Sequence, residues 1–190
     1  MKARECIEFA VSLVHDKDAE GMLSAVEEEL TDEQKVILKR YLSGVNSAVD
    51  TIASRYYDSE KEVRVTSDIE QRISYNALDE RVYEIVWVKE MGGSKVQFYG
   101  LPFSLFVPKR NHEYVVKFKF LPAKATGLDD ELEILPFVPM RAIGYLMASD
   151  ICLSKNLYDE AKFWFNNFES VLNQAKTARR MRTLNIKHLL

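Results

Sequence analysis

Residues 140–176 read MRAIGYLMASDICLSKNLYDEAKFWFNNFESVLNQAK, and their apolar positions predict two helices joined by a short turn. Apolar side chains at the spacing of one helical face define the first helix: Met140, Ile143, Gly144, Met147 and Ile151. The second helix has an even cleaner apolar stripe, formed by Ala161, Trp164, Phe165, Phe168, Val171, Leu172 and Ala175. Asn156 is expected to cap this second helix. The stretch therefore predicts an α-helical hairpin.

The segment that follows the hairpin has a different character. Residues 174–190 contain no acidic side chain, and basic residues alternate there with aliphatic ones. Because the apolar stripe ends before this segment, we expect its partner to be another molecule. Nucleic acid is one alternative, since each Lys or Arg neutralises a phosphate. The segment has no aromatic residue to stack on bases, however, and its alternation favours a protein groove.

Length and composition indicate a packed globular protein. The chain has 190 residues, of which 47% are hydrophobic and 29% charged, and its net charge is −3. These values favour one domain, or one domain with an insertion, and exclude a generally basic nucleic-acid binder. Residues 1–33 are acidic and the last seventeen are basic, an asymmetry that suits head-to-tail contacts between subunits.

Residues typical of catalytic or metal sites do not form a recognisable set. His15, His112 and His188 have no partners at metal-ligand spacing. The acidic cluster at residues 129–133 lacks the central glycine of a calcium loop, and the chain has neither a glycine-rich phosphate loop nor a nucleophile elbow. We therefore expect no enzyme activity, no catalytic or metal-binding residue and no cofactor.

The two cysteines and the N-terminus bear on the cellular compartment. Cys6 and Cys152 each fall on the apolar stripe of a predicted helix, so we expect small buried thiols in a reducing compartment. A disulfide or a reactive thiol is the less favoured alternative. The N-terminus lacks the apolar core of a signal peptide, and no apolar run approaches the roughly 20 residues that span a bilayer. We expect synthesis in the cytoplasm and no membrane contact.

Before the hairpin, the chain predicts helices and then strands. A short helix is expected at residues 3–14, followed by a charged break at 15–20 and a second short helix at 22–30. Thr31 and Gln34 have the spacing of a capping box, which predicts the start of a long helix that ends near Tyr57. From Asp58 the apolar period changes from 3.6 to 2, which indicates strands.

We expect these strands to pair as two hairpins. Residues 82–89 and 95–99 flank Met91-Gly92-Gly93-Ser94, a typical hairpin turn. Residues 103–107 are expected to pair with residues 114–121. The predicted fold is α+β, a helical bundle with an inserted antiparallel sheet. Its parts are a helical part (1–58), a β insertion (59–122), an acidic linker with the hairpin (123–178) and a docking tail (179–190).

The order of these elements resembles the head–tail connector (adaptor) proteins of tailed bacteriophages, the tail tubular protein A-like subunits that form a ring beneath the portal. The resemblance is one of layout and spans almost the whole chain. Five segments carry the resemblance: a long helix (38–57), a strand that leads to a Leu-Pro pair (114–122), an acidic linker that ends in Leu-Pro (129–136), a helical hairpin (142–175) and a basic tail (Arg179-Arg180). The sheet of about sixty residues departs from the simplest, all-helical adaptors.

The resemblance implies a structural protein of the virion neck, at the head–tail junction. It implies a homo-oligomeric ring, usually of twelve copies, that binds the portal above and tail or neck proteins below. Double-stranded DNA would pass through without specific binding. The portal contact would be Arg179, Arg180, Met181, Arg182, Leu184, Ile186 and Leu190. Contacts between subunits are expected at Tyr83, Trp87, Tyr114 and Trp164.

Two other interpretations of the hairpin are possible from the sequence. One is a cytoplasmic helical interaction module or regulator that uses the hairpin face. The other is a tetratricopeptide repeat, because Asn156-Leu157-Tyr158-Asp159-Glu160-Ala161 is similar to that motif. Such repeats need several tandem copies to bury their faces, and the chain has one at most.

Overall fold

The computed structural model describes residues 1–25, 30–57, 59–134 and 137–187, with side chains described up to residue 178. The chain divides into two compact units. Residues 1–49 and 124–190 form a helical unit, and residues 50–123 form a β unit. The predicted α+β fold with an antiparallel insertion is confirmed.

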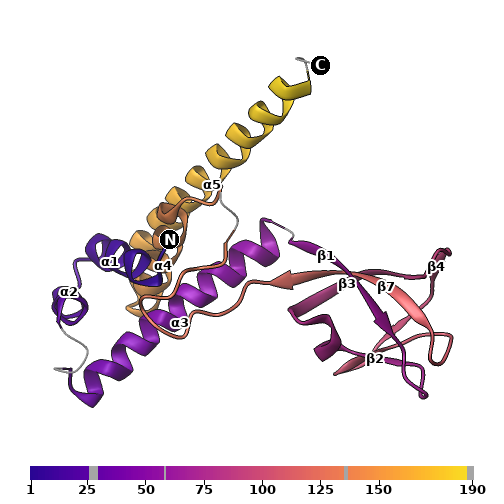
Figure 1. Ribbon diagram of the computed structural model, residues 1–190. Coiled ribbons are helices and arrows are strands. Elements are labelled where there is room, and N and C mark those ends of the chain that lie inside the picture. Colours follow the sequence, from indigo (N-terminus) through magenta and orange to yellow (C-terminus); the bar gives the residue numbers. More distant parts are fainter. Residues whose placement is uncertain (26–29, 58, 135–136, 188–190) are drawn as a thin grey trace. The chain divides into compact units, whose positions relative to one another are not determined.

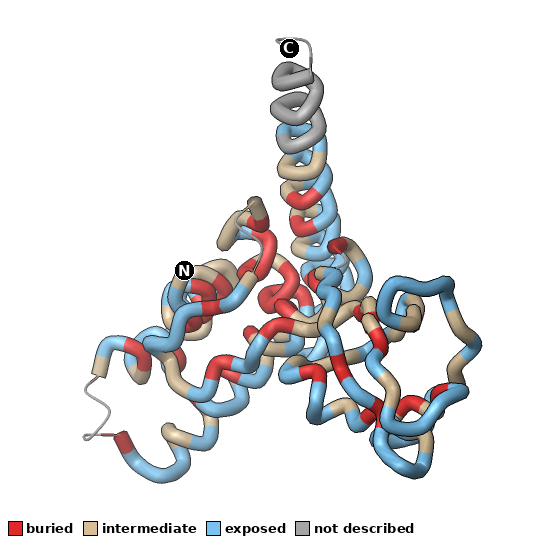
Figure 2. Tube along the Cα trace, turned by 45° about the vertical axis from the view of Figure 1, so that its right-hand side comes forward, coloured by how far each residue is buried: buried red, intermediate tan, exposed pale blue. Residues whose placement is uncertain are grey.

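Five helices are seen in the described part of the chain (Figure 1): α1 (Ala3–Leu13), α2 (Lys17–Ser24), α3 (Asp32–Arg55), α4 (Met140–Ser154) and α5 (Tyr158–Lys187). Of α3, residues up to Val49 belong to the helical unit. Helix α4 contacts both α1 and α5, and most of its side chains are buried, as its red segments in Figure 2 show. An apolar helix buried on several sides organises the core around itself.

Close packing of α1 on α4 depends on a glycine. A Cβ atom placed at Gly144 would lie 2.2 Å from Cδ1 of Phe9, far inside van der Waals contact. The ring of Phe9 also meets that of Tyr145 edge to face, with centroids 5.5 Å apart. Only glycine leaves room for the Phe9 ring at this crossing.

The capping box predicted at the start of α3 is confirmed. The N–H of Thr31 donates to Oε1 of Gln34 at 2.9 Å, and the N–H of Gln34 donates to Oγ1 of Thr31 at 3.3 Å. Helix α3 then runs for 24 residues to Arg55, two residues short of the predicted end. Its first-turn acids, Asp32 and Glu33, are favoured by the helix dipole.

A second short helix is present, but its predicted bounds were wrong. Instead of a charged break at 15–20 and a helix at 22–30, α2 spans Lys17–Ser24. Asp16 is its N-cap and accepts the N–H of Ala19 at 3.2 Å, while the positive φ of His15 (52°) reverses the chain just before it. A charged helical turn resembles a loop in sequence, because capping and dipole effects rather than apolar spacing stabilise it. Residues 26–29 lie outside the described part.

The acidic linker holds the beginning of α1. The N–H groups of Ala3 and Arg4 donate to the carbonyls of Asp130 and Leu128, at 3.0 and 2.8 Å. Asp129 forms ion pairs with Lys2 and Arg4, and Asp130 accepts hydrogen bonds from Thr126 and Gly127. These contacts lower the pKa of both carboxyls: Arg4 is the main cause for Asp129, and the Gly127 N–H for Asp130. The linker carbonyls thus satisfy amides that a helix N-terminus leaves unpaired.

The β unit contains two antiparallel sheets. The larger has the order β1-β7-β3-β4 and consists of β1 (Glu60–Thr66), β7 (Glu113–Leu121), β3 (Arg81–Glu90) and β4 (Lys95–Val96). The smaller has the order β2-β6-β5 and consists of β2 (Arg72–Ser74), β6 (Ser104–Phe106) and β5 (Tyr99–Gly100), with a 3-10 turn at Tyr75–Leu78. One hydrophobic core contains residues of both sheets, among them Ile73, Leu105, Tyr114, Val116 and Phe118.

One predicted hairpin is confirmed over part of its length, because only Lys95–Val96 of the predicted return strand 95–99 pairs with β3, while Tyr99 belongs to β5. The other predicted hairpin was wrong. Strands β3 and β4 pair around the Met91–Ser94 turn, where Gly92 has a φ of 71°. Residues 103–107 do not pair with 114–121. Strand β6 pairs with β2 and β5, whereas β7 pairs with β1 and β3. Both segments place apolar side chains in the same core, and period-2 alternation identifies the buried face but not the neighbouring strand.

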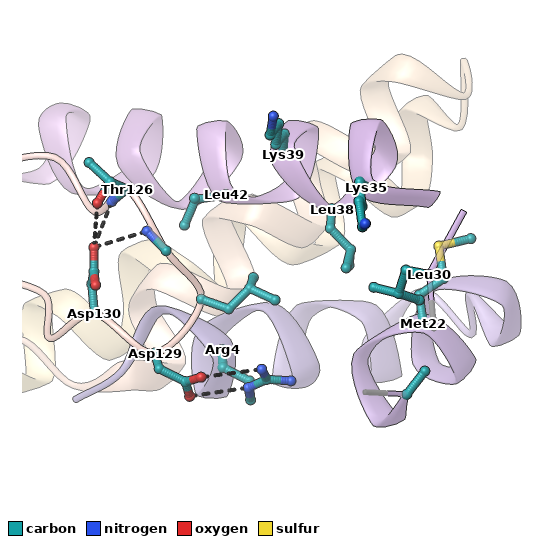
Figure 3. A pocket seen from close by; sticks show the side chains of 13 residues that line it. Arg4, Met22, Leu30, Lys35, Leu38, Lys39, Leu42, Thr126, Asp129 and Asp130 are labelled. Carbon is teal, nitrogen blue, oxygen red and sulfur yellow. Dashed lines mark hydrogen bonds and ion pairs between the residues drawn. The ribbon is translucent and has the colours of Figure 1, made fainter. Parts of the chain in front are cut away.

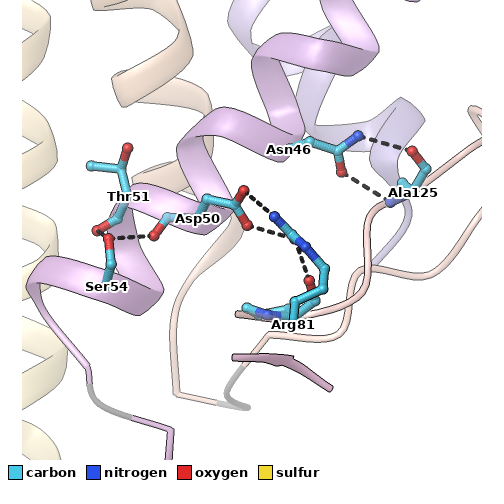
Figure 4. Close-up of polar contacts among 7 residues, drawn as sticks. Asn46, Asp50, Thr51, Ser54, Arg81 and Ala125 are labelled. Atoms are coloured by element: carbon cyan, nitrogen blue, oxygen red, sulfur yellow. Dashed lines mark hydrogen bonds and ion pairs between the residues drawn. The ribbon is translucent and has the colours of Figure 1, made fainter. Parts of the chain in front are cut away.

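Two side chains of α3, those of Asn46 and Asp50, form hydrogen bonds with residues next to or within the strands (Figure 4). In the helical unit, the Asn46 side-chain amide donates to the Ala125 carbonyl at 2.8 Å and accepts the Ala125 N–H at 2.9 Å. In the β unit, the Arg81 guanidinium donates to both carboxylate oxygens of Asp50, at 2.9 and 2.7 Å, and to the Pro122 carbonyl at 2.6 Å. Bidentate pairs of this kind fix geometry as well as adding energy.

Candidate docking surfaces

Helix α5 is twice as long as the helix against which it packs. Helix α4 has 15 residues and α5 has 30. In the interface, Ser149 Oγ donates to the Ala161 carbonyl at 2.9 Å, and Phe168 and Leu172 are fully buried. Among the side chains that the structure describes, Leu172 is the last buried one on α5. The described side chains that follow, at residues 173–178, are exposed or only partly covered.

The segment expected to be a separate tail begins as part of a helix. The backbone of α5 continues to Lys187, through six of the seven residues predicted to bind the portal. Leu190, the seventh, lies outside the described residues, as do the side chains from residue 179 onward. At 1.5 Å per residue, the helix beyond Leu172 extends for roughly 20 Å.

Trp164, expected at a subunit contact, is already half covered within its own unit. Its indole stacks on Tyr145, with ring centroids 5.7 Å apart and an interplanar angle of 12°, and Phe163 meets it edge-on at 4.8 Å. Trp164 as a whole is intermediate in exposure. It therefore packs within the hairpin without being fully covered.

The other three expected interface residues lie in the β unit and differ in exposure. Tyr114 is fully buried in the core, and its hydroxyl accepts the N–H of Lys109 at 2.9 Å, so it offers no surface to a neighbour. Tyr83 is 36% exposed on β3, next to a register shift between Val82 and Glu84. Trp87 is half-buried.

Trp87 lies beneath two lysines. The Nζ atoms of Lys89 and Lys95 are 4.2 and 5.9 Å from the centroid of its ring, and the two lysines are directly paired across β3 and β4. Like charges at such a cross-strand position repel each other, whereas each ammonium is attracted to the face of the indole. Strand β4 is the edge of the larger sheet, where lysine discourages pairing with another chain.

An apolar patch that the apolar spacing did not predict lies at the turn of the hairpin. This hairpin-turn patch consists of exposed side chains from the end of α4 and the first turns of α5: Leu153, Leu157, Tyr158 and Phe165. Beside it, Lys155 pairs with Asp16, with 3.0 Å between Nζ and Oδ2. The stripe analysis had assigned Phe165 to the buried face, whereas it is 37% exposed, because α4 covers only one side of α5.

The helical unit also contains a groove of about 640 Å³ between the first helices, α3 and the linker (Figure 3). Its lining is apolar in the middle, with Met22, Leu30, Leu38, Leu42 and Leu128. Its rim is charged, with Lys35 and Lys39 on α3 and the Arg4–Asp129 ion pair opposite. Within the described ranges, neither lysine has an ion-pair partner.

Neither a metal-binding cluster nor a membrane-spanning helix is found in the described part of the molecule. It contains no cluster of three or more histidine, cysteine, aspartate or glutamate side chains that could bind a metal ion. None of its helices has the length and apolarity required to cross a bilayer. Cys6 and Cys152 are free and buried; burial raises both thiol pKa values, that of Cys6 to about 12.

The described surface has four notable features: the part of α5 beyond Leu172, the hairpin-turn patch, the groove and the exposed side chains of the β unit. No family model and no curated protein sequence matches the chain.

Proposed function

We propose that this protein is a head–tail connector subunit of a tailed bacteriophage, which forms a ring between the portal and the tail. The observation that carries the proposal is the length of α5, since its last described buried residue is Leu172 and its backbone continues as a helix to Lys187. Residues 174–190 contain no acid, so the projecting end of the chain is basic and aliphatic. A helix of this composition suits an apolar groove with an acidic rim on a portal.

The charges of the molecule agree with a channel through which DNA slides. The protein carries a net charge of −3, so it has little general affinity for phosphates. We expect double-stranded DNA to bind more weakly than about 1 μM even at low salt, where phosphate contacts are strongest. Sub-micromolar binding in a titration of the purified chain would contradict this part of the proposal.

A pulldown on the portal ring of the same phage tests the docking. The full chain should be retained, and a chain truncated after Ala178 should not be. The truncation removes no described buried side chain, so the shortened chain should remain folded, which circular dichroism and urea unfolding can verify. Lys162→Glu, an exposed change earlier on α5, is the matched control and should still bind. Undiminished retention of the truncated chain would overturn the docking proposal.

A second candidate function is supported by the hairpin-turn patch. Exposed Leu157 and Tyr158 are typical of a helical interaction module that binds a protein partner through its hairpin. In that case Leu157→Ser and Tyr158→Ser would abolish partner binding, and truncation after Ala178 would not. The same pulldown, with both kinds of variant, distinguishes the two functions.

A further inference from the structure

The β unit exposes an unusually apolar segment that comprises β5 and the turn into β6. Tyr99, Leu101 and Phe103 are 65%, 37% and 85% exposed, and Gly100 and Pro102 between them are also exposed. No residue from Tyr99 to Phe103 carries a charge. We call this segment the apolar loop. A run of exposed apolar residues costs solubility, and its presence on a folded surface indicates a binding site.

Hydrogen bonds hold the apolar loop in one conformation without covering its side chains. The N–H of Leu101 donates to the Ser104 carbonyl at 2.8 Å, and the N–H of Tyr75 donates to the Phe103 carbonyl at 3.1 Å. The next apolar residue along β6, Leu105, is fully buried. The backbone is thus fixed on both sides of the exposed side chains, and a loop held in this way loses little entropy on binding.

A surface that can accept such a loop exists in the helical unit of the same chain. The groove has an apolar floor of Leu30, Leu38 and Leu42, each 6–8% exposed, and a volume of about 640 Å³. Its charged groups stand on the rim, as Figure 3 shows for Lys35, Lys39 and Asp129. An uncharged loop can therefore reach the floor while the rim charges stay hydrated, so no charge is buried without a partner.

We infer that the apolar loop of one copy binds in the groove of the next copy. Because the loop and the groove are different surfaces, the contact is heterologous, and each copy gives one loop and accepts another. Contacts of this kind form a ring when the rotation between neighbouring copies closes, and a filament when it does not. The inference rests on the proposed ring, whose subunit contact it identifies. An aromatic side chain buries about 150–250 Å². Two aromatics and a leucine remain below the about 800 Å² per partner of a stable interface, so the contact is weak in free protein.

Cysteine cross-linking between copies tests this contact. Pro102→Cys places a thiol in the loop and leaves Leu101 and Phe103 intact, and Lys39→Cys places one on the groove rim. A mixture of the two variants should form a disulfide-linked dimer under mild oxidation, about tenfold or more above either variant alone, because docking raises the effective concentration of the thiols. The native cysteines are at most 1% exposed and should not compete.

Matched controls make each outcome decisive. Phe103→Ser added to the Pro102→Cys chain should abolish the cross-link, and its side chain is too exposed to affect folding. A mixture of Pro102→Cys with Lys162→Cys, a thiol on an exposed site away from the groove, should give only background. Cross-linking of Pro102→Cys with itself would indicate a loop-to-loop contact and overturn the inference, as would a mixture no better than the Lys162→Cys control.

Two further measurements distinguish this contact from portal docking and from lipid binding. The chain truncated after Ala178 keeps both the loop and the groove, so it should cross-link as well as the full chain even though it no longer binds the portal. The two experiments can therefore contradict portal docking and the contact between copies separately. Binding to vesicles of phosphatidylethanolamine and phosphatidylglycerol that is lost in Phe103→Ser would assign the loop to a lipid surface, and would overturn the contact between copies.

Discussion

The ammonium of Lys155 lies 3.0 Å from the carboxylate of Asp16, and so joins the hairpin turn to the start of α2 across 139 residues of sequence. The same carboxylate accepts the hydroxyl of Tyr41 at 3.0 Å and the N–H of Ala19 at 3.2 Å. Burial raises the pKa of Asp16, but the hydrogen bonds from Lys155, Ala19 and Tyr41 outweigh that effect, and the pKa is lowered overall. One carboxylate thus links α2, α3 and the hairpin.

This link predicts a pH-dependent loss of stability. Asp16→Ala, which removes both the cap and the ion pair, should cost about 1–2 kcal/mol in urea unfolding at neutral pH. Asp16→Asn keeps the capping oxygen and should cost about 0.2–1 kcal/mol. Because the folded pKa lies below the unfolded value of about 3.9, the charge contributes fully above that value and is lost as pH falls through the folded pKa. The difference in the free energy of unfolding between wild type and Asp16→Asn should therefore vanish in acid. If that difference stayed the same in acid, the predicted role of the Asp16 charge would be contradicted.

Gly144 and Gly21 form a matched pair for the packing of α1 on α4. Gly144→Ala would push a methyl group against Phe9 and should cost about 1–3 kcal/mol. Gly21→Ala, in α2 with nothing within 4 Å of the new Cβ, should stabilise the protein by about 0.5–1 kcal/mol. Adding Phe9→Ala should recover part of the cost of Gly144→Ala, and additive losses in the double variant would show that the crossing is looser than the structure indicates.

The paired lysines over Trp87 predict a stabilising substitution. Lys95→Glu replaces a repulsive cross-strand neighbour of Lys89 with an attractive one, and should raise the free energy of unfolding by about 0.2–1 kcal/mol. Lys95→Gln removes only the repulsion and should give a smaller gain. Both gains should shrink at high salt, which screens exposed charges. A loss of stability in Lys95→Glu, measured by tryptophan fluorescence during urea unfolding, would mean that the cation–π contact outweighs the repulsion.

The two cysteines should be unreactive in the folded protein. With a pKa of about 12, Cys6 has roughly a thousandfold less thiolate near neutral pH than a free thiol of pKa about 8.5. Burial, followed by the charge of Glu160, raises the pKa of Cys152 as well. A chromogenic disulfide reagent should titrate neither thiol in the native chain and both in denaturant. Rapid native reaction of either thiol would show that its helix opens locally.

The buried and exposed faces of β7 and β3 could be predicted from the sequence only in part. Along β7 the alternation is regular, and Tyr114, Val116 and Phe118 share one buried face. Alternation along β3 did not place Tyr83 and Trp87, because register shifts at Val82/Glu84 and Ile85/Trp87 change which residues face the core. The C-terminal segment was found from its composition alone. The apolar loop and the hairpin-turn patch were not found, because exposure depends on what packs above a residue.

The sequence by itself determined the local structure: the Thr31–Gln34 capping box, the α4–α5 hairpin and the turn at Gly92. Each depends on residues within a few positions of one another, so spacing and residue type are sufficient. Only the tertiary structure decided that β6 joins β2 and β5 rather than β7, that the linker after Gly127 caps α1, and that Gly144 makes room for Phe9. These contacts join segments that are distant along the chain. Which segments pair depends on the entropy of closing the loop between them and on complementary shape, and the apolar periodicity of a segment contains no information on either.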